Sequence, residues 1–156
     1  MGTTIDRVGE GYRLEATQRL SRPIEAVFPF FADAFNLESI TPPTLRFRIL
    51  TAQPLVMRAG TMIDYRLRIS GVPVRWRSEI TAWEPPFRFV DEQRRGPYRW
   101  WIHEHGFHEE GDETVVTDRV DYGVPGGALV HRFLVGPAVR RIFAYRAQGL
   151  QTRFGD

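Results

Sequence analysis

The protein has 156 residues, the length of a single domain that can bury its own hydrophobic core. Hydrophobic residues make up 42% of the chain and charged residues 26%, and the formal net charge of +2 is too small to predict a nucleic-acid partner. The absence of cysteine excludes disulfides, thiolate nucleophiles and cysteine-ligated zinc, and no apolar run approaches the ~18 residues that a membrane-spanning helix needs.

The first third of the chain predicts one strand followed by two short helices. Residues 1–11, "MGTTIDRVGEG", carry no apolar signal segment, and we expect them to form a flexible N-terminal segment ahead of a single domain over residues 12–156. "YRLEATQRL" (12–20) alternates between apolar and polar positions, which is typical of a half-buried strand. "SRPIEAVFPFFAD" (21–33) has apolar residues at helical spacing, and "NLESITPP" (36–43) predicts one more helical turn.

Residues 45–93 predict a run of antiparallel strands with a charged outer face. The segments with strand character are 45–52, 61–71, 74–83 and 87–93. Glycine at the first central position of a two-residue turn, Gly71-Val72, predicts a type II′ hairpin. That turn sets Arg68 opposite Arg75 and Arg66 opposite Arg77 on the outer face, where Trp83 is the one aromatic residue. Whether this arginine ladder is a screened charged surface or an anion-binding patch stays open.

The segment "RWWIHEHGFHEEGD" (99–112) holds three of the four histidines of the chain. A two-residue turn at Gly111-Asp112 predicts a hairpin with these opposite pairs: Trp101 and Tyr122, His103 and Val120, His105 and Asp118, Phe107 and Val116. The partner strand is apolar at these positions, so the odd-numbered residues from 101 to 107 face the interior. A buried carboxylate needs a partner, and we expect His105 to be the partner of Asp118.

After "GVPGG" the pattern becomes helical to the end of the chain, over "ALVHRFLVGPAVRRIFAYRAQGLQTRF" (128–154). Arg146 lies within the apolar face of this helix, and Gly136-Pro137 should bend the helix after its first two turns. The order of elements predicts an α+β fold in which a curved antiparallel sheet of about six to seven strands wraps around the long C-terminal helix. The two short helices close one end, and a pocket is expected between sheet and helix.

The order of elements and three segments, "SRPIEAVFPFFAD", "PYRWWIHEHGFHEEGDETVVTDRVDYGVP" and "IFAYR", resemble the START-like (SRPBCC) helix-grip superfamily. The resemblance covers nearly the whole chain from Tyr12 onward, and the nearest branch is bacterial and related to polyketide cyclases and coenzyme-Q-binding proteins. It implies the helix-grip fold. It does not imply one activity, because the superfamily includes lipid carriers, receptors, cyclases and oxygenase domains.

Three interpretations of the inward polar residues are open: a structural hydrogen-bonded network, the lining of a ligand pocket, or a metal site built from two histidines and one carboxylate. We predict the binding of a small hydrophobic or aromatic molecule, without a metal or cofactor. The alternatives are a polyketide cyclase- or dehydratase-like enzyme that uses acid–base residues in the same cavity, and a quinone or lipid carrier. The predicted ligand-binding residues are Tyr65, Trp76, Phe89, Trp101, His103, His105, Phe107, Asp118, Tyr122, Phe143 and Arg146. We expect a cytoplasmic protein with no nucleic-acid partner and no integral membrane segment, and homodimerisation is left open.

Overall fold

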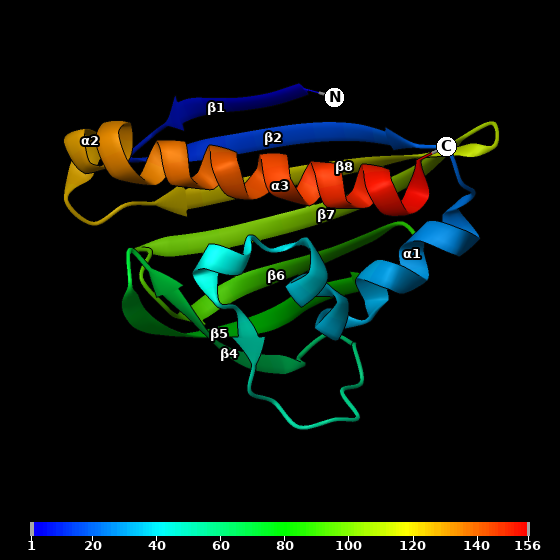
Figure 1. The fold of residues 1–156 in the computed structure, drawn as a ribbon, viewed down its shortest axis with the longest axis horizontal. Helices are drawn as coiled ribbons and strands as arrows, with labels where there is room; N and C mark the ends of the chain where they lie inside the picture. Colours follow the sequence, from blue (N-terminus) through cyan, green and yellow to red (C-terminus); the bar gives the residue numbers. More distant parts are fainter. Residues whose placement is uncertain (1, 156) are drawn as a thin grey trace.

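The computed structural model describes residues 2–155, and its strands form one antiparallel sheet in the order β1-β2-β8-β7-β6-β5-β4-β3 (Figure 1). The strands are β1 (Gly2–Val8), β2 (Gly11–Leu20), β3 (Arg48–Ile49), β4 (Met62–Ile69), β5 (Val72–Glu84), β6 (Arg88–Arg95), β7 (Trp100–Glu110) and β8 (Glu113–Gly123). The sheet therefore has eight strands, slightly more than predicted, and the α+β helix-grip fold is confirmed.

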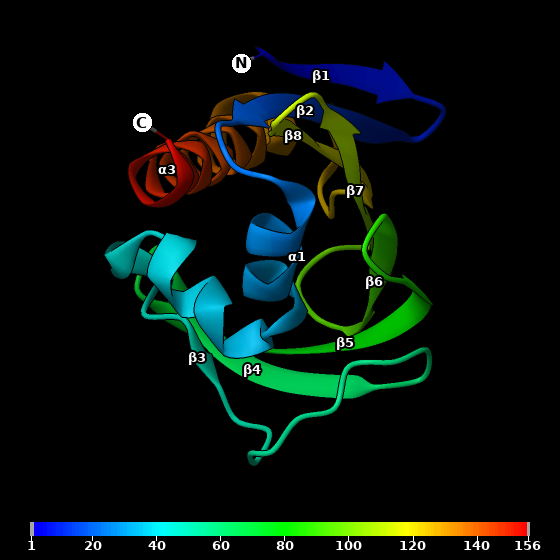
Figure 2. The same ribbon diagram turned by 90° about the vertical axis from the view of Figure 1, so that its right-hand side faces the viewer.

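The helices lie on the concave side of this sheet. They are α1 (Ile24–Ala32), the 3₁₀ helices η1 (Ala34–Ile40) and η2 (Pro43–Leu45), α2 (Gly127–Val130), the π-helical turn η3 (His131–Val135) and α3 (Gly136–Phe154). Figure 2 shows the sheet curving around α1, with α3 over the β2 and β8 side and the η1 region over the opposite side. Among the described residues, no helix is both long enough and apolar enough to cross a membrane.

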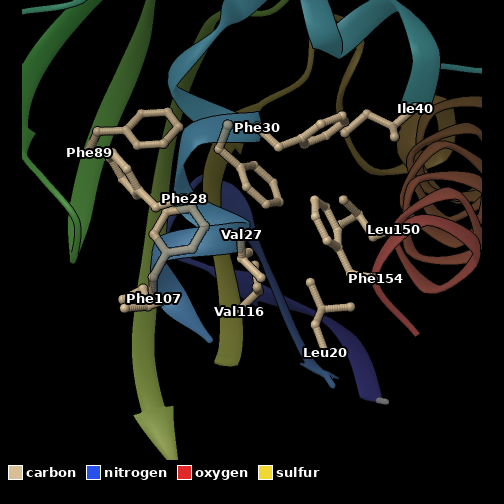
Figure 3. Close-up of a cluster of buried hydrophobic side chains, with 12 residues drawn as sticks. Leu20, Val27, Phe28, Phe30, Ile40, Phe89, Phe107, Val116, Leu150 and Phe154 are labelled. Atoms are coloured by element: carbon tan, nitrogen blue, oxygen red, sulfur yellow. The ribbon is translucent and has the colours of Figure 1, made fainter. Parts of the chain in front are cut away.

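The largest buried cluster joins α1 to the sheet and to the end of α3 (Figure 3). The helical spacing of Ile24, Val27, Phe28 and Phe31 turns these side chains toward the sheet, and all four are buried. Phe28 packs edge-on against Phe107, with ring centroids 5.2 Å apart. This cluster fixes α1 and α3 relative to the sheet and so positions the elements that carry the candidate site.

The N-terminal segment and the third strand differ from the sequence-based expectations. Where we expected a flexible segment over residues 1–11, β1 pairs along its whole length with β2, from Gly2 opposite Thr17 to Val8 opposite Gly11. Its side chains are mostly exposed, so it lacks the apolar alternation that identifies a strand in a sequence. The strand predicted over 45–52 is limited to Arg48–Ile49, because Arg46 adopts a left-handed conformation with φ 46°.

The strands of the β4–β5 hairpin pair two residues away from the predicted register, because the turn is formed by Ser70-Gly71 instead of Gly71-Val72. Ser70 and Gly71 both have positive φ, 50° and 80°, as a type I′ turn requires. The predicted opposition of Arg68 to Arg75 and of Arg66 to Arg77 is therefore wrong: Arg66 lies opposite Arg75, and Arg77 lies opposite Asp64 and forms an ion pair with it at 2.7 Å. A shift of two residues preserves the alternation of faces, so the inward residues of both strands remain inward.

The predicted position of Trp83 on the outer face is wrong, because β5 contains a bulge. The pairing of β5 with β6 shifts between Ile80 and Ala82, which reverses the alternation of side chains beyond that point. Trp83 is therefore partly buried instead of facing outward, and its ring lies 5.4 Å from that of Phe89.

The C-terminal helical region is continuous from Gly127 to Phe154, with a π-helical turn in place of a simple bend at Gly136-Pro137. Pro137 lies in the first turn of α3, directly after the π-helical turn, in which the Gly136 N–H donates to the His131 carbonyl oxygen. The irregularity of this helix therefore precedes the predicted position and spans His131–Val135.

Trp100 occupies a slot that only a residue without a side chain can form. A Cβ atom added at Gly123 would lie 2.6–2.7 Å from three atoms of the Trp100 ring. We expect Gly123→Ala to lower the free energy of unfolding by about 1–2 kcal/mol, because the indole must shift. Chemical denaturation checks this. The matched control is Gly2→Ala, where an added Cβ meets nothing within 4 Å, and an equal loss in both variants would contradict the slot.

Candidate functional site

The β7–β8 hairpin has the register that the sequence predicts. Trp101 lies opposite Tyr122, His103 opposite Val120, His105 opposite Asp118 and Phe107 opposite Val116. His103, His105 and Asp118 are buried, with exposed fractions of 6%, 5% and 8%. Two imidazoles and a carboxylate therefore lie on the concave side of the sheet, as expected.

The hydrogen bonds between these residues run diagonally across the strands, which corrects the predicted partner of Asp118. His103 Nε2 lies 2.7 Å from Asp118 Oδ1, whereas His105 Nε2 lies 2.6 Å from Oδ2 of Asp91 on β6. His105 Nδ1 is 3.7 Å from Asp118 Oδ1. The two imidazole rings stack with centroids 3.7 Å apart. Each histidine thus bonds to a carboxylate that is diagonal to it in the sheet, His103 to Asp118 and His105 to Asp91.

Arg146 of α3 completes the network from the helix side. Its Nη2 lies 3.5 Å from Asp118 Oδ1 and donates to His105 Nδ1 at 3.4 Å. The guanidinium carbon lies 5.4 Å from the ring centre of Phe31 and 6.0 Å from that of Phe143, so aromatic faces flank the cation. Within residues 2–155, Arg146 Nε is buried and has no hydrogen-bond partner. The network consequently keeps one unused donor.

The contacts of His105 define its tautomer and its charge. Because Nδ1 accepts from Arg146, the ring proton lies on Nε2 and is donated to Asp91. Burial and the nearby His103 together lower the pKa of His105 to about 4, against the opposing effect of Asp91. His105 is therefore a neutral imidazole at pH 7.

The two carboxylates stay ionised. Burial alone would raise the pKa of Asp118, but Arg146 and the hydrogen bond from His103 outweigh burial, and the net effect is a lowered pKa. Burial likewise opposes the charge of Asp91, whereas the hydrogen bond from His105 and the proximity of His103 lower its pKa. The site therefore combines two carboxylates, one guanidinium and one neutral imidazole within a mostly apolar interior.

A cavity of about 80 Å³ opens beside this network, between η1 and the inner face of strands β3–β6. Of the predicted ligand-binding residues, it is lined by Tyr65, Phe89, His105 and Arg146. Asp91 lies on the same wall, so the hydrogen bond between His105 and Asp91 is at the cavity surface.

The other predicted ligand-binding residues lie outside this cavity, and most of them pack into the core. Tyr122 and Phe143 belong to a buried cluster near the start of α3, against which Trp101 packs, and Trp76 contacts Trp101 edge-on with centroids 5.6 Å apart. Phe107 belongs to the α1 cluster. His103 and Asp118 stand behind His105 and Arg146, so they contact the cavity-lining residues without lining the cavity.

Half of the cavity wall comes from residues 30–57, where the sequence predicted short helices and a strand but no ligand-binding residue. These wall residues are Phe30, Phe31, Asp33, Ala34, Leu37, Ile40, Phe47, Ile49 and Met57. The region from η1 to β4 has no long regular element and hence no hydrophobic period from which an inward face can be assigned. The one available signal is the density of large apolar residues between Ala34 and Met57 in a segment otherwise rich in turn residues.

A second polar group lies on the β4–β5 wall of the cavity. The hydroxyl groups of Tyr65 and Ser78 are 3.1 Å apart, and Trp76 Nε1 donates to Ser78 Oγ at 3.0 Å. Burial raises the pKa of Tyr65 well above its ordinary value, so the phenol keeps its proton. The cavity thus presents hydroxyl groups on β4 and β5 and the Asp91–His105–Arg146 group on the adjacent wall.

Asp91, His103 and His105 bring potential metal ligand atoms within 4.8 Å of one another. The stacked imidazoles, with an interplanar angle of 23°, do not converge on a common point as the ligands of a tetrahedral or octahedral ion do. The Arg146 guanidinium, at 3.4 Å from His105 Nδ1, would also repel a cation. These contacts favour a hydrogen-bonded network over a metal centre.

Comparisons with known proteins agree with this architecture. Residues 20–150 match the family model described as polyketide cyclase / dehydrase and lipid transport. Among solved structures, protein Ms6760 from Mycobacterium smegmatis is 17% identical, with a TM-score of 0.69 and coverage of 97% of this chain and 96% of that one. The Zhui aromatase/cyclase from Streptomyces sp. R1128 is 15% identical, with a TM-score of 0.71 and coverage of 90% and 92%. No protein with a curated function matches.

A START superfamily protein from Mycobacterium smegmatis has a TM-score of 0.63 at 13% identity and covers 91% of this chain and 96% of its own. At these identities the solved structures establish the fold alone, whereas the family model covers most of the sequence. The chain belongs to the polyketide cyclase/dehydrase and lipid-transport family, within the START-like superfamily that its sequence resembles.

Proposed function

We propose that the protein binds a small, mostly apolar or aromatic molecule that carries a polar oxygen, in the cavity between η1 and strands β3–β6. Family membership supports a hydrophobic-ligand-binding or cyclase-like role at the coarse level. The observation that carries the finer proposal is the placement of Asp91, His105 and Arg146 on one wall of an otherwise apolar cavity. Convergent polar groups in an apolar cavity are the usual anatomy of a small-molecule site.

The polar groups of the cavity can orient an uncharged ligand by hydrogen bonds alone. The protonated phenol of Tyr65 can donate a hydrogen bond to a carbonyl or hydroxyl oxygen of the ligand. Arg146 has a buried Nε–H without a partner among residues 2–155, so a ligand oxygen that accepted from it would remove an unsatisfied donor. The apolar walls would bury the rest of the ligand.

The cavity volume limits the ligand that fits without rearrangement. A volume of about 80 Å³ is smaller than the roughly 150 Å³ of an engineered cavity that binds benzene. A ligand with one aromatic ring therefore requires movement of the wall, and Leu37 of η1 and Met57 of the segment before β4 are flexible side chains on that wall. A long lipid chain would require a much larger opening, which supports a compact ligand over a lipid cargo.

A cyclase- or dehydratase-like activity is the second candidate, because a neutral imidazole held by a carboxylate is an arrangement used in acid–base catalysis. His105 Nδ1, after losing its hydrogen bond from Arg146, would accept a proton from a carbon next to a ketone, and Tyr65 would donate a hydrogen bond to the enolate oxygen that forms. A pKa of about 4 makes His105 a weak base near neutral pH, however. This supports binding over catalysis as the primary role.

Phenol is the smallest probe that joins one aromatic ring to one hydroxyl group, and we expect it to bind in the cavity. Titration followed by methyl NMR should shift the signals of Ile63 and Ile80, which line the cavity. His105→Phe should weaken phenol binding about tenfold, the effect of losing one favourable polar interaction of about 1.4 kcal/mol. His108→Phe is the matched control, because that side chain is 54% exposed.

The stability of both variants must be measured alongside affinity. Unchanged phenol affinity in a destabilised His105→Phe variant would show that the network is structural only and would contradict the proposal. Turnover of a poly-β-ketone substrate by the wild-type chain, abolished in His105→Phe, would instead support the cyclase alternative.

A further inference from the structure

The start of the C-terminal helical region exposes large apolar side chains. In the segment Gly127–Val135, which we call the helical tip, the exposed fractions of Leu129, Phe133 and Leu134 are 70%, 66% and 65%. On the other side of the same tip, Val130 and Val135 pack against a buried cluster. The tip is therefore apolar on both sides, a property of helices that are covered on all sides by protein or lipid.

The helical tip lies at one end of the molecule, where nothing in residues 2–155 covers its outer side. Figure 1 shows α2 at the end of the helical region that lies away from α1 and the C-terminus. The tip is held on its inner side, because His131 stacks on Tyr12 with centroids 3.5 Å apart and accepts or donates a hydrogen bond with the Tyr122 hydroxyl at 2.8 Å. The exposed side chains are thus presented on a fixed support.

The C-terminal segment that carries the helical tip has charged side chains of one sign. Residues 122–155 include five arginines and neither aspartate nor glutamate. Arg132 lies within the tip, and Arg140 and Arg141 follow Phe133 by seven and eight residues, about 10 Å further along the helical region. All three are exposed, and none forms an ion pair with another residue in the described part of the chain.

This combination distinguishes between the partners that could cover the apolar side chains. A second copy of the chain, joined about a twofold axis, would bring the same face against itself and place unpaired arginines near one another. The surface of an anionic bilayer offers both components that the tip needs, an apolar layer for the three side chains and phosphate groups for the arginines.

We propose that the helical tip docks on an anionic phospholipid bilayer. Leu129, Phe133 and Leu134 insert at the boundary between headgroups and acyl chains, and Arg132, Arg140 and Arg141 contact the lipid phosphates. The contact is peripheral and reversible, because three apolar side chains on a short helical segment bury far less surface than a membrane-spanning helix. The proposal does not depend on the cavity or on its ligand.

Vesicle flotation with the full-length chain tests the docking. The wild type is expected to float with vesicles of phosphatidylcholine containing 30% phosphatidylglycerol, and to bind vesicles of phosphatidylcholine alone at least tenfold more weakly. Phe133→Ser should weaken binding to the anionic vesicles at least fivefold. Phe87→Ser is the matched control: that side chain is 58% exposed in the β5–β6 turn, away from the tip, and its loss should leave binding unchanged.

Charge and self-association provide the remaining measurements. Replacing Arg140 and Arg141 together by Gln should weaken binding to anionic vesicles, and 0.5 M salt should do the same. Thermal melting checks that the variants fold. Absence of wild-type flotation overturns the proposal, and so does equal flotation of Phe133→Ser and Phe87→Ser. A dimer in sedimentation velocity that Phe133→Ser dissociates, without vesicle binding, would assign the tip to self-association instead. None of these outcomes bears on phenol binding in the cavity.

Discussion

Replacement of Arg146 by Met is expected to lower the free energy of unfolding by about 3–5 kcal/mol, the usual cost of removing one member of a buried ion pair. Arg146 and Asp118 have exposed fractions of 6% and 8%, so water cannot replace the lost partner. Asp118 would keep the hydrogen bond from His103 but would lose the only guanidinium within reach among the described residues. Chemical denaturation of the purified variant measures the loss.

Arg141→Met is the matched control on the same helix, because Arg141 is exposed and forms no ion pair in the described part of the chain. Its effect should stay within about 0.5 kcal/mol. Adding Asp118→Asn to Arg146→Met should restore part of the lost stability, because the uncompensated charge is removed with its partner. A loss below about 1 kcal/mol in Arg146→Met would contradict the assignment of this contact as a buried ion pair.

Acidification from pH 7 to pH 4.5 is expected to lower the free energy of unfolding by about 2 kcal/mol through His105 alone. Its pKa is about 4 in the folded protein, against about 6.5 for an unperturbed histidine. Between these values the unfolded chain binds a proton that the folded protein does not, so stability is complete above pH 6.5 and falls as the pH decreases through this window. Asp91 and Asp118, whose pKa values are lowered, add a further loss below about pH 4.

Urea denaturation at a series of pH values tests this dependence. His105→Gln should flatten the curve between pH 6.5 and pH 4.5, whereas His108→Gln should leave it unchanged because His108 is exposed. A wild-type free energy of unfolding that stays constant from pH 7 to pH 4.5 would show that His105 is not held neutral by burial.

Regular elements of this fold could be predicted from the sequence where two independent signals agreed. For the β7–β8 hairpin, apolar alternation and the two-residue turn at Gly111-Asp112 indicate the same register, and the structure has that register. For the β4–β5 hairpin the sequence indicated which residues face inward but not which residues pair, because both Gly71-Val72 and Ser70-Gly71 are acceptable turns. Trp83 faces inward because of a bulge, which leaves no mark in the alternation of the sequence.

The candidate site was predictable in composition and less so in contacts. The register places His103, His105 and Asp118 on one face, but which imidazole reaches which carboxylate depends on side-chain rotamers and on the neighbouring strand. The position of the cavity depends on η1 and on Met57, which lie in a region without a repeating apolar period. The sequence therefore indicated a polar group inside the fold without locating the space beside it.

The balance of formal charges in the buried network has a consequence for guest selection. Asp91 and Asp118 contribute two negative charges, Arg146 contributes one positive charge, and His105 is neutral at pH 7. An ionised fatty acid or any other carboxylate would bring a third negative charge next to Asp91 at low dielectric. The cavity should consequently bind ionised carboxylic acids more weakly than uncharged phenols, ketones or quinones of similar size.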